Sequence, residues 1–87
     1  MSVDTLDTIQ QKLIRFLEEE ILVDKEQSKI APDQSLFSGV LDSLGTLRLV
    51  VFIEETYGIQ VADGELIPEN FDTVERLAKY IQTKTAA

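Results

Sequence analysis

The residues best suited to chemistry are a carboxylate and a hydroxyl side by side, Asp42 and Ser43, within the segment 39–44. Asp is a residue type that begins helices, because its carboxylate accepts a hydrogen bond from a free backbone N–H of the first turn. Ser43 would then lie where unpaired N–H groups and the positive end of the helix dipole favour a phosphate. The pattern is compatible with a phosphate ester on Ser43, but for these two residues taken alone a simple helix cap is the favoured interpretation.

The sequence contains few residues suited to other catalytic chemistry or to metal binding. The chain contains no His and no Cys, so the commonest general base, thiolate nucleophiles and the ligands of most zinc sites are absent. Paired carboxylates remain, but a small helical domain leaves little room for a water-excluding pocket. The segment 63–65 lacks the alternating oxygen ligands of a calcium loop. We therefore expect no catalytic residue, no metal site and no enzyme activity.

The segment that Ser43 would begin extends to Tyr57, at about 43–57, and Gly58 suits a C-terminal stop. Most of residues 44–53 are apolar, and such a run fits a buried helix or a buried strand. The length of the stretch 46–57, which has no Gly or Pro, favours a helix, whereas the β-branched Val50, Val51 and Ile53 favour a strand. From the residues alone, both alternatives stay open.

Two further segments have clear helical periodicity. The first, at about 4–21, carries an apolar stripe and has Asp4 or Asp7 to cap its start. The last, at about 73–83, has Asp72 as its expected cap and Glu75 three residues later, as in a capping box. We expect the two stripes to pack together as core; they consist of Leu6, Leu13 and Phe16 in the first helix and Val74, Leu77, Ala78 and Ile81 in the last.

Two connections separate these helices. The loop 22–42 contains Pro32 and Gly39 but also apolar anchors, which favour an ordered, functional loop; the anchors are Ile30, Leu36, Phe37, Val40 and Leu41. The stretch 59–70 is turn-rich, with one short helix at about 63–67 that Gly64 and Pro68 interrupt. The sequence therefore predicts an all-α fold, a bundle with one long connection.

Composition limits the partners. The chain has 87 residues, 44% of them hydrophobic, and a formal net charge of −8, which repels nucleic acid and anionic lipid. The longest apolar run is too short to span a bilayer, and the first residues lack a signal-peptide pattern. We expect one domain over 1–87, monomeric and cytoplasmic, without nucleic-acid binding or membrane insertion.

Combined, these motifs resemble those of an acyl carrier protein. The resemblance covers about residues 4 to 82. Its first matching motif is Leu36-Phe37 with Gly39, at the end of the family's long first loop. It continues with Asp42-Ser43-Leu44, Leu47, Leu49-Val50 and Glu54-Glu55 ahead of an aromatic residue and a short loop. It ends with Phe71-Asp72-Thr73-Val74, which match the start of the last helix.

The resemblance implies a four-helix bundle of three main helices and one short helix, with a long loop between the first two. It also implies that 43–57 is helical and that 4′-phosphopantetheine, taken from coenzyme A, is attached to Ser43 through a phosphodiester. Its thiol would hold an acyl or aminoacyl group as a thioester. The implied partners are a phosphopantetheinyl transferase, an acid-activating ligase for acyl or aminoacyl groups, and acyl-processing enzymes. They would dock on the helix after Ser43, at Leu44, Gly45, Leu47, Arg48, Val51, Glu54 and Glu55. For Leu44, Leu47 and Val51, core packing alone is the favoured interpretation.

Two positions depart from carriers of fatty-acid synthesis, which have acids two and five residues after the serine. Gly45 and Arg48 stand there instead. Gly45 costs up to about 1 kcal/mol relative to Ala in a helix and is expected to leave bare backbone beside the cofactor. Arg48 is expected to alter partner choice, unless it merely pairs with a neighbour such as Glu55. The pattern looks closer to D-alanyl carrier proteins and other stand-alone carriers. The alternative function is an acidic helical adaptor that binds a basic protein without a cofactor.

Overall fold

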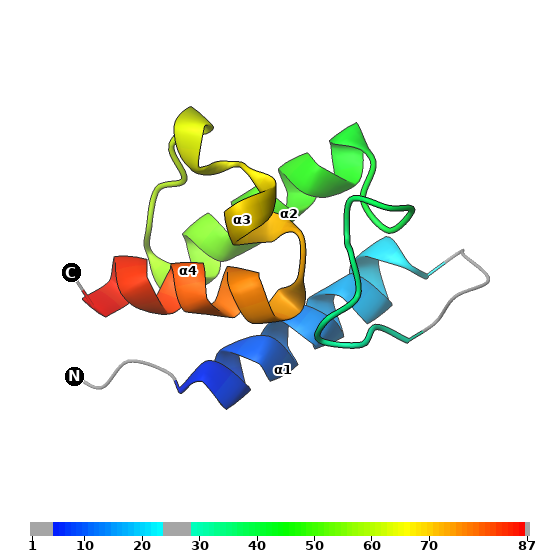
Figure 1. Cartoon of the computed structure of the whole chain (residues 1–87), viewed down its shortest axis with the longest axis horizontal. Helices are drawn as coiled ribbons and strands as arrows, with labels where there is room; N and C mark the ends of the chain where they lie inside the picture. Colours follow the sequence, from blue (N-terminus) through cyan, green and yellow to red (C-terminus); the bar gives the residue numbers. More distant parts are fainter. Residues whose placement is uncertain (1–4, 24–28, 87) are drawn as a thin grey trace.

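The structure, a computed structural model, describes residues 5–23 and 29–86, which contain helices and no strand (Figure 1). The α-helices are α1 (Leu6–Phe16), α2 (Ser43–Tyr57), α3 (Pro68–Phe71) and α4 (Val74–Ala86). A π-helical segment, η1 (Leu17–Ile21), continues α1, and a 3₁₀ turn, η2 (Asp63–Glu65), precedes α3. The prediction of an all-α four-helix fold with a long loop after the first helix is confirmed.

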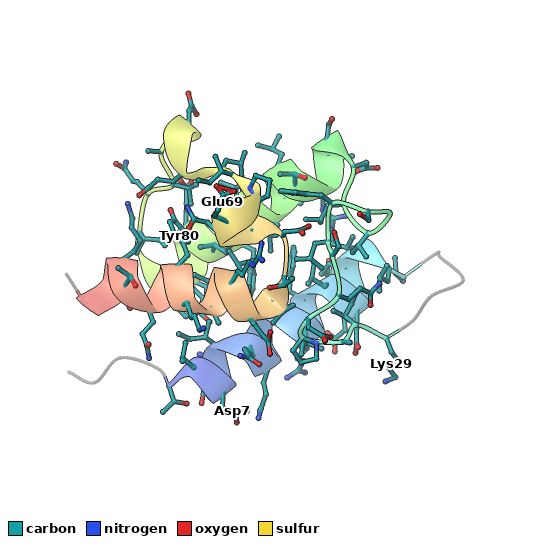
Figure 2. The ribbon with its side chains drawn as sticks, viewed as in Figure 1. Asp7, Lys29, Glu69 and Tyr80 are labelled. Atoms are coloured by element: carbon teal, nitrogen blue, oxygen red, sulfur yellow. The ribbon has the colours of Figure 1, made fainter. Side chains whose placement is uncertain are left out.

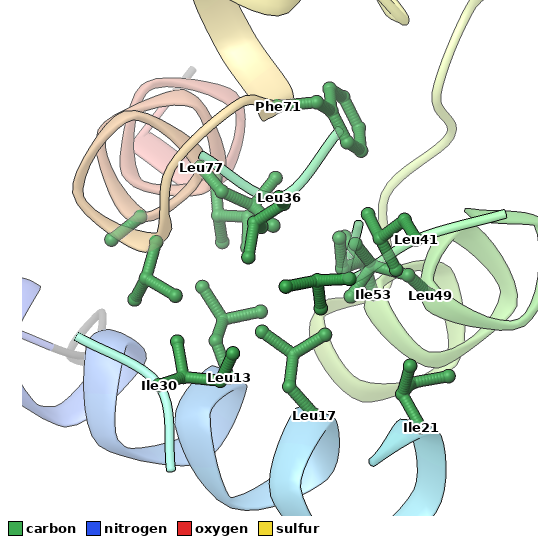
Figure 3. Close-up of a cluster of buried hydrophobic side chains, with 14 of the residues drawn as sticks. Leu13, Leu17, Ile21, Ile30, Leu36, Leu41, Leu49, Ile53, Phe71 and Leu77 are labelled. Carbon is green, nitrogen blue, oxygen red and sulfur yellow. The ribbon is translucent and has the colours of Figure 1, made fainter. Parts of the chain in front are cut away.

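The helices pack around one apolar core. In Figure 1, α1 and α4 lie side by side, α3 packs on α4, and α2 passes behind them. Figure 3 shows Leu13 and Leu17 directed from the first helix toward Leu49 and Ile53 of α2. All four side chains are fully buried, as is Leu77 of α4. Helix-to-helix packing of apolar side chains therefore holds the fold together.

The expected pairing of the first and last helices is confirmed with one exception. The stripe of α4 is buried over its whole length, and Leu13 of α1 is buried with it. Leu6 is half-buried at the edge of this cluster. Phe16 is the exception, because its ring stacks on Phe52 of α2, with 4.3 Å between centroids. Phe16 thus joins the first helix to α2.

The first helix begins later than predicted; it ends at Ile21, as predicted, but its last part is π-helical. Thr5 is its cap, and the Thr5 hydroxyl accepts a hydrogen bond from the Thr8 N–H at 3.1 Å. The expected cap at Asp7 is wrong, because Asp7 lies inside the first turn; Asp4 falls outside the described residues. At the other end, the Leu22 N–H donates to the Leu17 carbonyl at 2.9 Å, across five residues.

This wider turn has a packing consequence. Each residue added to a helical turn rotates the following side chains relative to an α-helix. With this rotation, the side chains of Leu17, Ile21 and Leu22 are all buried. Glu18, within the same segment, accepts a hydrogen bond from the Ile30 N–H at 2.9 Å. Through Glu18, the π-helical end of the first helix therefore holds the long loop at Ile30, where the loop returns to the core.

The C-terminal elements also differ from expectation. The short helix expected at 63–67 is only the turn η2, and Pro68 begins α3 instead of interrupting a helix. Pro suits the first helical position, where its missing N–H has no helical partner to lose. The last helix continues to Ala86, beyond the expected end at 83.

Asp72 holds the long loop instead of capping α4. The Arg76 N–H donates to the Thr73 hydroxyl at 3.0 Å, which makes Thr73 the capping residue. The Asp72 carboxylate accepts from the Ser35 hydroxyl at 2.6 Å and from the Phe37 N–H at 3.3 Å. Its carbonyl accepts from the Leu36 N–H at 2.6 Å. The loop therefore reaches α2 from a fixed point at the α3–α4 junction.

The apolar anchors of the loop are in the core, as expected, except one. Ile30, Leu36, Val40 and Leu41 are buried, whereas Phe37 is exposed. Gly39 has a φ of 107°, a conformation that residues with a Cβ rarely adopt. It lies directly before Val40, and the chain turns there toward Asp42. The loop is an ordered part of the structure over its described residues.

Leu77→Ala should lower the free energy of unfolding by about 2–4 kcal/mol, because it leaves a cavity between α1 and α4. Lys79→Ala, on the exposed face of the same helix, is the matched control and should cost much less. Urea titrations of both variants test this. Equal midpoints for Leu77→Ala and the wild type would show that the two helices are not packed together.

Asp72→Ala should lower Tm at neutral pH and have little effect in strong acid. The Ser35 hydroxyl, more than the Phe37 N–H, holds the pKa of Asp72 below its usual range. Because the folded-state pKa is lowered, this carboxylate stabilises the fold above the unfolded-chain pKa of about 3.9. Its contribution disappears as pH falls through the folded-state pKa.

Thermal melts of the wild type and of Asp72→Ala, from neutral pH down to strong acid, measure the Tm difference between them. Asp33→Ala, which removes an exposed acid from the same loop, is the matched control. A Tm difference that stayed constant into strong acid would contradict a role for the Asp72 charge.

Candidate functional site

Asp42 and Ser43 stand at the start of α2, as predicted. The Asp42 backbone is extended, and its carboxylate accepts a hydrogen bond from the Gly45 N–H at 2.7 Å. The Thr46 N–H and hydroxyl both donate to the Asp42 carbonyl, at 2.9 and 2.8 Å. Ser43 is the first residue of α2, and it is exposed. Its hydroxyl is therefore accessible at the positive end of a 15-residue helix.

Gly45 is buried, so the expectation that it lies on a docking surface is wrong. A Cβ at this position would lie 3.1 Å from Asp42 Oδ1 and 3.5 Å from Leu41 Cδ2. The glycine therefore lets the capping carboxylate approach the first turn closely. Its cost in helix propensity is offset by the cap, and it leaves no bare backbone exposed beside Ser43.

A hollow of about 300 Å³ opens beside Ser43. One side consists of α2 residues, and the other comes from the segment between α2 and α3. The lining is largely apolar, with Thr46, Leu47 and Val50 on one side and Val61, Ala62, Asp63 and Leu66 on the other. Sequence reasoning did not identify this second side, because residues 59–66 have no periodicity that would predict which of them face α2.

Two carboxylates hold the far side of this hollow. Glu54 of α2 accepts a hydrogen bond from the Val61 N–H at 2.9 Å, and Glu65 accepts from the Ala62 N–H at 3.0 Å. Glu54 is half-buried in this contact. The prediction that Glu54 docks partners does not fit its position, because its carboxylate is directed to the backbone of its own chain.

Glu65 also links this segment to α4. Its carboxylate accepts from the Tyr80 hydroxyl at 3.0 Å and from Lys84 Nζ at 3.0 Å. Figure 2 shows Tyr80 between α4 and the segment that precedes α3. The Ala62 N–H, followed by Lys84, lowers the pKa of Glu65. Burial, followed by the Glu65 contact, raises the pKa of Tyr80 to about 12. At neutral pH, Glu65 is therefore charged and Tyr80 is a hydrogen-bond donor.

The apolar stripe of α2 next to Ser43 faces outward. Leu44, Leu47 and Val51 are 65%, 60% and 44% exposed. The favoured interpretation of these three residues as core is therefore wrong. Leu49 and Ile53 supply the core from the opposite face of the helix. We call Leu44, Leu47 and Val51 the α2 stripe. Glu55, another expected docking residue, is exposed near its end.

Arg48 contacts the first helix and not Glu55. Its guanidinium donates to the Glu20 carbonyl at 3.1 Å and pairs with the Glu20 carboxylate at 3.3 Å. Carbonyls at a helix C-terminus lack helical partners, and a cation there complements the dipole. Arg48 therefore caps the end of the first helix from α2.

Within the described ranges, no helix is both long enough and apolar enough to cross a membrane. In the same ranges, no three carboxylates are grouped as metal ligands would be.

Comparisons with known proteins place these features in context. The family model described as "Phosphopantetheine attachment site" matches residues 7–81. The D-alanyl carrier protein of Streptococcus uberis is 33% identical over 76 residues, which cover 86% of this chain and 92% of that protein. The D-alanyl carrier protein of Streptococcus pyogenes serotype M5 is 39% identical over 51 residues, which cover 58% of this chain and 65% of that protein. The range matched by the family model includes Ser43 and all of α2.

Proposed function

This chain belongs to the phosphopantetheine-attachment family of acyl carrier proteins, similar to D-alanyl carriers, and we propose that Ser43 is its attachment residue. The observation that carries the proposal is the position of Ser43. It is an exposed hydroxyl on the first residue of a capped helix, next to an open hollow. Ser35 lies elsewhere, in the long loop, and its hydroxyl already donates to Asp72.

The site suits an anionic phosphodiester. The positive end of α2 and the N–H groups of its first residues favour negative charge at Ser43. Asp42 directs one carboxylate oxygen to the Gly45 N–H, and this bond keeps the first turn in place. The largely apolar hollow between Val50 and Val61 has space for an extended chain leading away from Ser43.

When attached, the cofactor supplies a thiol that holds cargo as a thioester, which a chain without Cys cannot supply itself. The protein's own residues carry out no reaction. Asp42 and Gly45 fix the start of α2, and Glu54 and Glu65 hold the side of the hollow that faces it. The chain is thus a carrier that presents one arm to successive enzymes.

We infer that the cargo is an aminoacyl group in a specialised pathway, because both relatives described above are named D-alanyl carriers. The partners are then a phosphopantetheinyl transferase, a ligase that activates the amino acid, and the enzymes that use the thioester. They dock on the α2 stripe and on Glu55, which are exposed on the same helix as Ser43.

Incubation with coenzyme A and a broad-specificity phosphopantetheinyl transferase should add one phosphopantetheine to the chain, and Ser43→Ala should abolish the gain. Intact-mass spectrometry measures both. Ser35→Ala and Ser38→Ala are the matched controls and should be modified like the wild type. Modification that persists in Ser43→Ala would contradict the assignment. A wild type that is never modified by an active transferase would instead support a cofactor-free adaptor.

The cofactor-bearing protein should form an aminoacyl thioester with D-alanine, ATP and a D-alanine-activating ligase. The product should be released by neutral hydroxylamine, as thioesters are, and the Ser43→Ala protein should form none. The comparison reaction is malonyl transfer by an acyltransferase of fatty-acid synthesis, which should be inefficient. Efficient malonyl transfer together with no D-alanyl loading would contradict the specialised-carrier proposal while leaving the carrier role intact.

A further inference from the structure

A second hollow lies on the other side of α2 from the Ser43 hollow. It measures about 360 Å³ and is lined by Phe16, Leu47, Arg48, Val51, Phe52 and Glu55. A neighbouring hollow of about 470 Å³ shares Phe16 and Phe52 and continues along the first helix to Lys12. We call the two together the α1–α2 groove. Its floor is the stacked pair Phe16 and Phe52, and neither ring is fully buried.

The charges around the groove are balanced and largely engaged with each other. Arg15 pairs with Glu19 at 3.1 Å, and Arg48 pairs with Glu20 at 3.3 Å. Lys12 lies over the Tyr57 ring, with its Nζ 5.8 Å from the centroid. Glu55 and Thr56 complete the rim. The groove is therefore close to neutral on a chain whose net charge is −8.

The groove is continuous with the α2 stripe, because Leu47 and Val51 belong to both. The part of α2 from Ser43 to Ile53 contains no acidic residue, and its one base is paired with Glu20. Val51 follows Ser43 by eight residues on one helix, a rise of about 12 Å. A protein interface of ordinary size, about 800 Å² on each partner, would cover both positions.

From this arrangement we propose that enzymes acting on Ser43 insert an apolar side chain into the α1–α2 groove and dock there mainly by apolar contact. The partner's docking surface is then apolar and nearly uncharged, since charge complementarity favours such a surface over a basic one. The inference rests on the proposed function, because it concerns enzymes that act on Ser43. It adds the first helix, through Phe16, to the docking surface of α2.

The proposal also assigns a positioning role to Arg48. By capping the first helix at Glu20, Arg48 links α2 to the helix that carries Phe16. The contact between Arg48 and Glu20 therefore holds α2 beside the first helix, and the Arg48 guanidinium is directed to Glu20.

The test uses the full chain, coenzyme A and a broad-specificity phosphopantetheinyl transferase, with KM and kcat measured separately. Val51→Asp places a charge in the groove and should raise KM about tenfold, with kcat changed by less than about twofold. Val51→Ile keeps the surface apolar and should raise KM much less than Val51→Asp does. Val23→Asp adds the same charge at a residue that is 67% exposed and lines neither hollow. It should change KM by less than about twofold.

Ionic strength gives an independent readout. Raising NaCl from about 50 mM to about 500 mM should raise the wild-type KM by less than about threefold, because screening weakens charge attraction and not apolar contact. A rise of about tenfold or more would overturn the proposal in favour of electrostatic docking. Circular dichroism melts establish that each variant is folded. If Val51→Asp fails to fold, Thr56→Asp, at an exposed rim position, replaces it with the same expected rise in KM.

The remaining outcomes separate this inference from the proposed function. Normal modification of Ser43 with an unchanged KM in Val51→Asp overturns the docking inference alone. Sedimentation of the wild type as a dimer that Val51→Asp dissociates also overturns it, because a second copy would then occupy the groove. Failure of the transferase to modify the wild type overturns the proposed function, and the docking inference with it.

Discussion

The hydrogen bond from the Gly45 N–H to the Asp42 carboxylate determines where α2 begins, and the arrangement of the site depends on it. In the helix that begins at Ser43, Leu49 and Ile53 are buried in the core and the α2 stripe is exposed. It also places the Ser43 hydroxyl at the positive end of the helix. Gly45 belongs to the same constraint, because a Cβ would press on the capping oxygen at 3.1 Å. One short contact thus sets the start of the helix and places Ser43 on its first residue.

Several carboxylates that contribute to the net charge of −8 have structural partners. Glu54 and Glu65 accept backbone N–H groups beside the Ser43 hollow, and Asp72 holds the long loop through Ser35 and Phe37. Backbone N–H groups in loops need acceptors when they leave water, and a charged acceptor forms a stronger bond than a neutral one. The acidity of this chain therefore organises its irregular segments as well as keeping its surface polar.

The two positions that depart from fatty-acid carriers also acquire structural explanations. A Cβ at Gly45 would crowd the capping carboxylate of Asp42, and the Arg48 guanidinium donates to the Glu20 carbonyl at the end of the first helix. Neither residue presents a free charge to a partner, and the surface around them is apolar and nearly neutral. A substitution that introduced acids at both positions would disturb the cap and the helix end. Its effect on partners would then be inseparable from its effect on the fold.

The sequence alone was sufficient to predict the cap at Asp42, the stop at Gly58 and the place of Ser43 at the start of α2, because each depends on residues adjacent along the chain. It was also sufficient for the buried stripe of α4, where periodicity alone defines a face. The partners of Arg48, Glu54 and Asp72 could be identified only in the folded chain. Their contacts span 28, 7 and 37 residues, and no local pattern encodes such pairings. The same reason explains the α2 stripe: a helix that is apolar nearly all round does not reveal which face the core will bury, and the neighbouring helices make that choice.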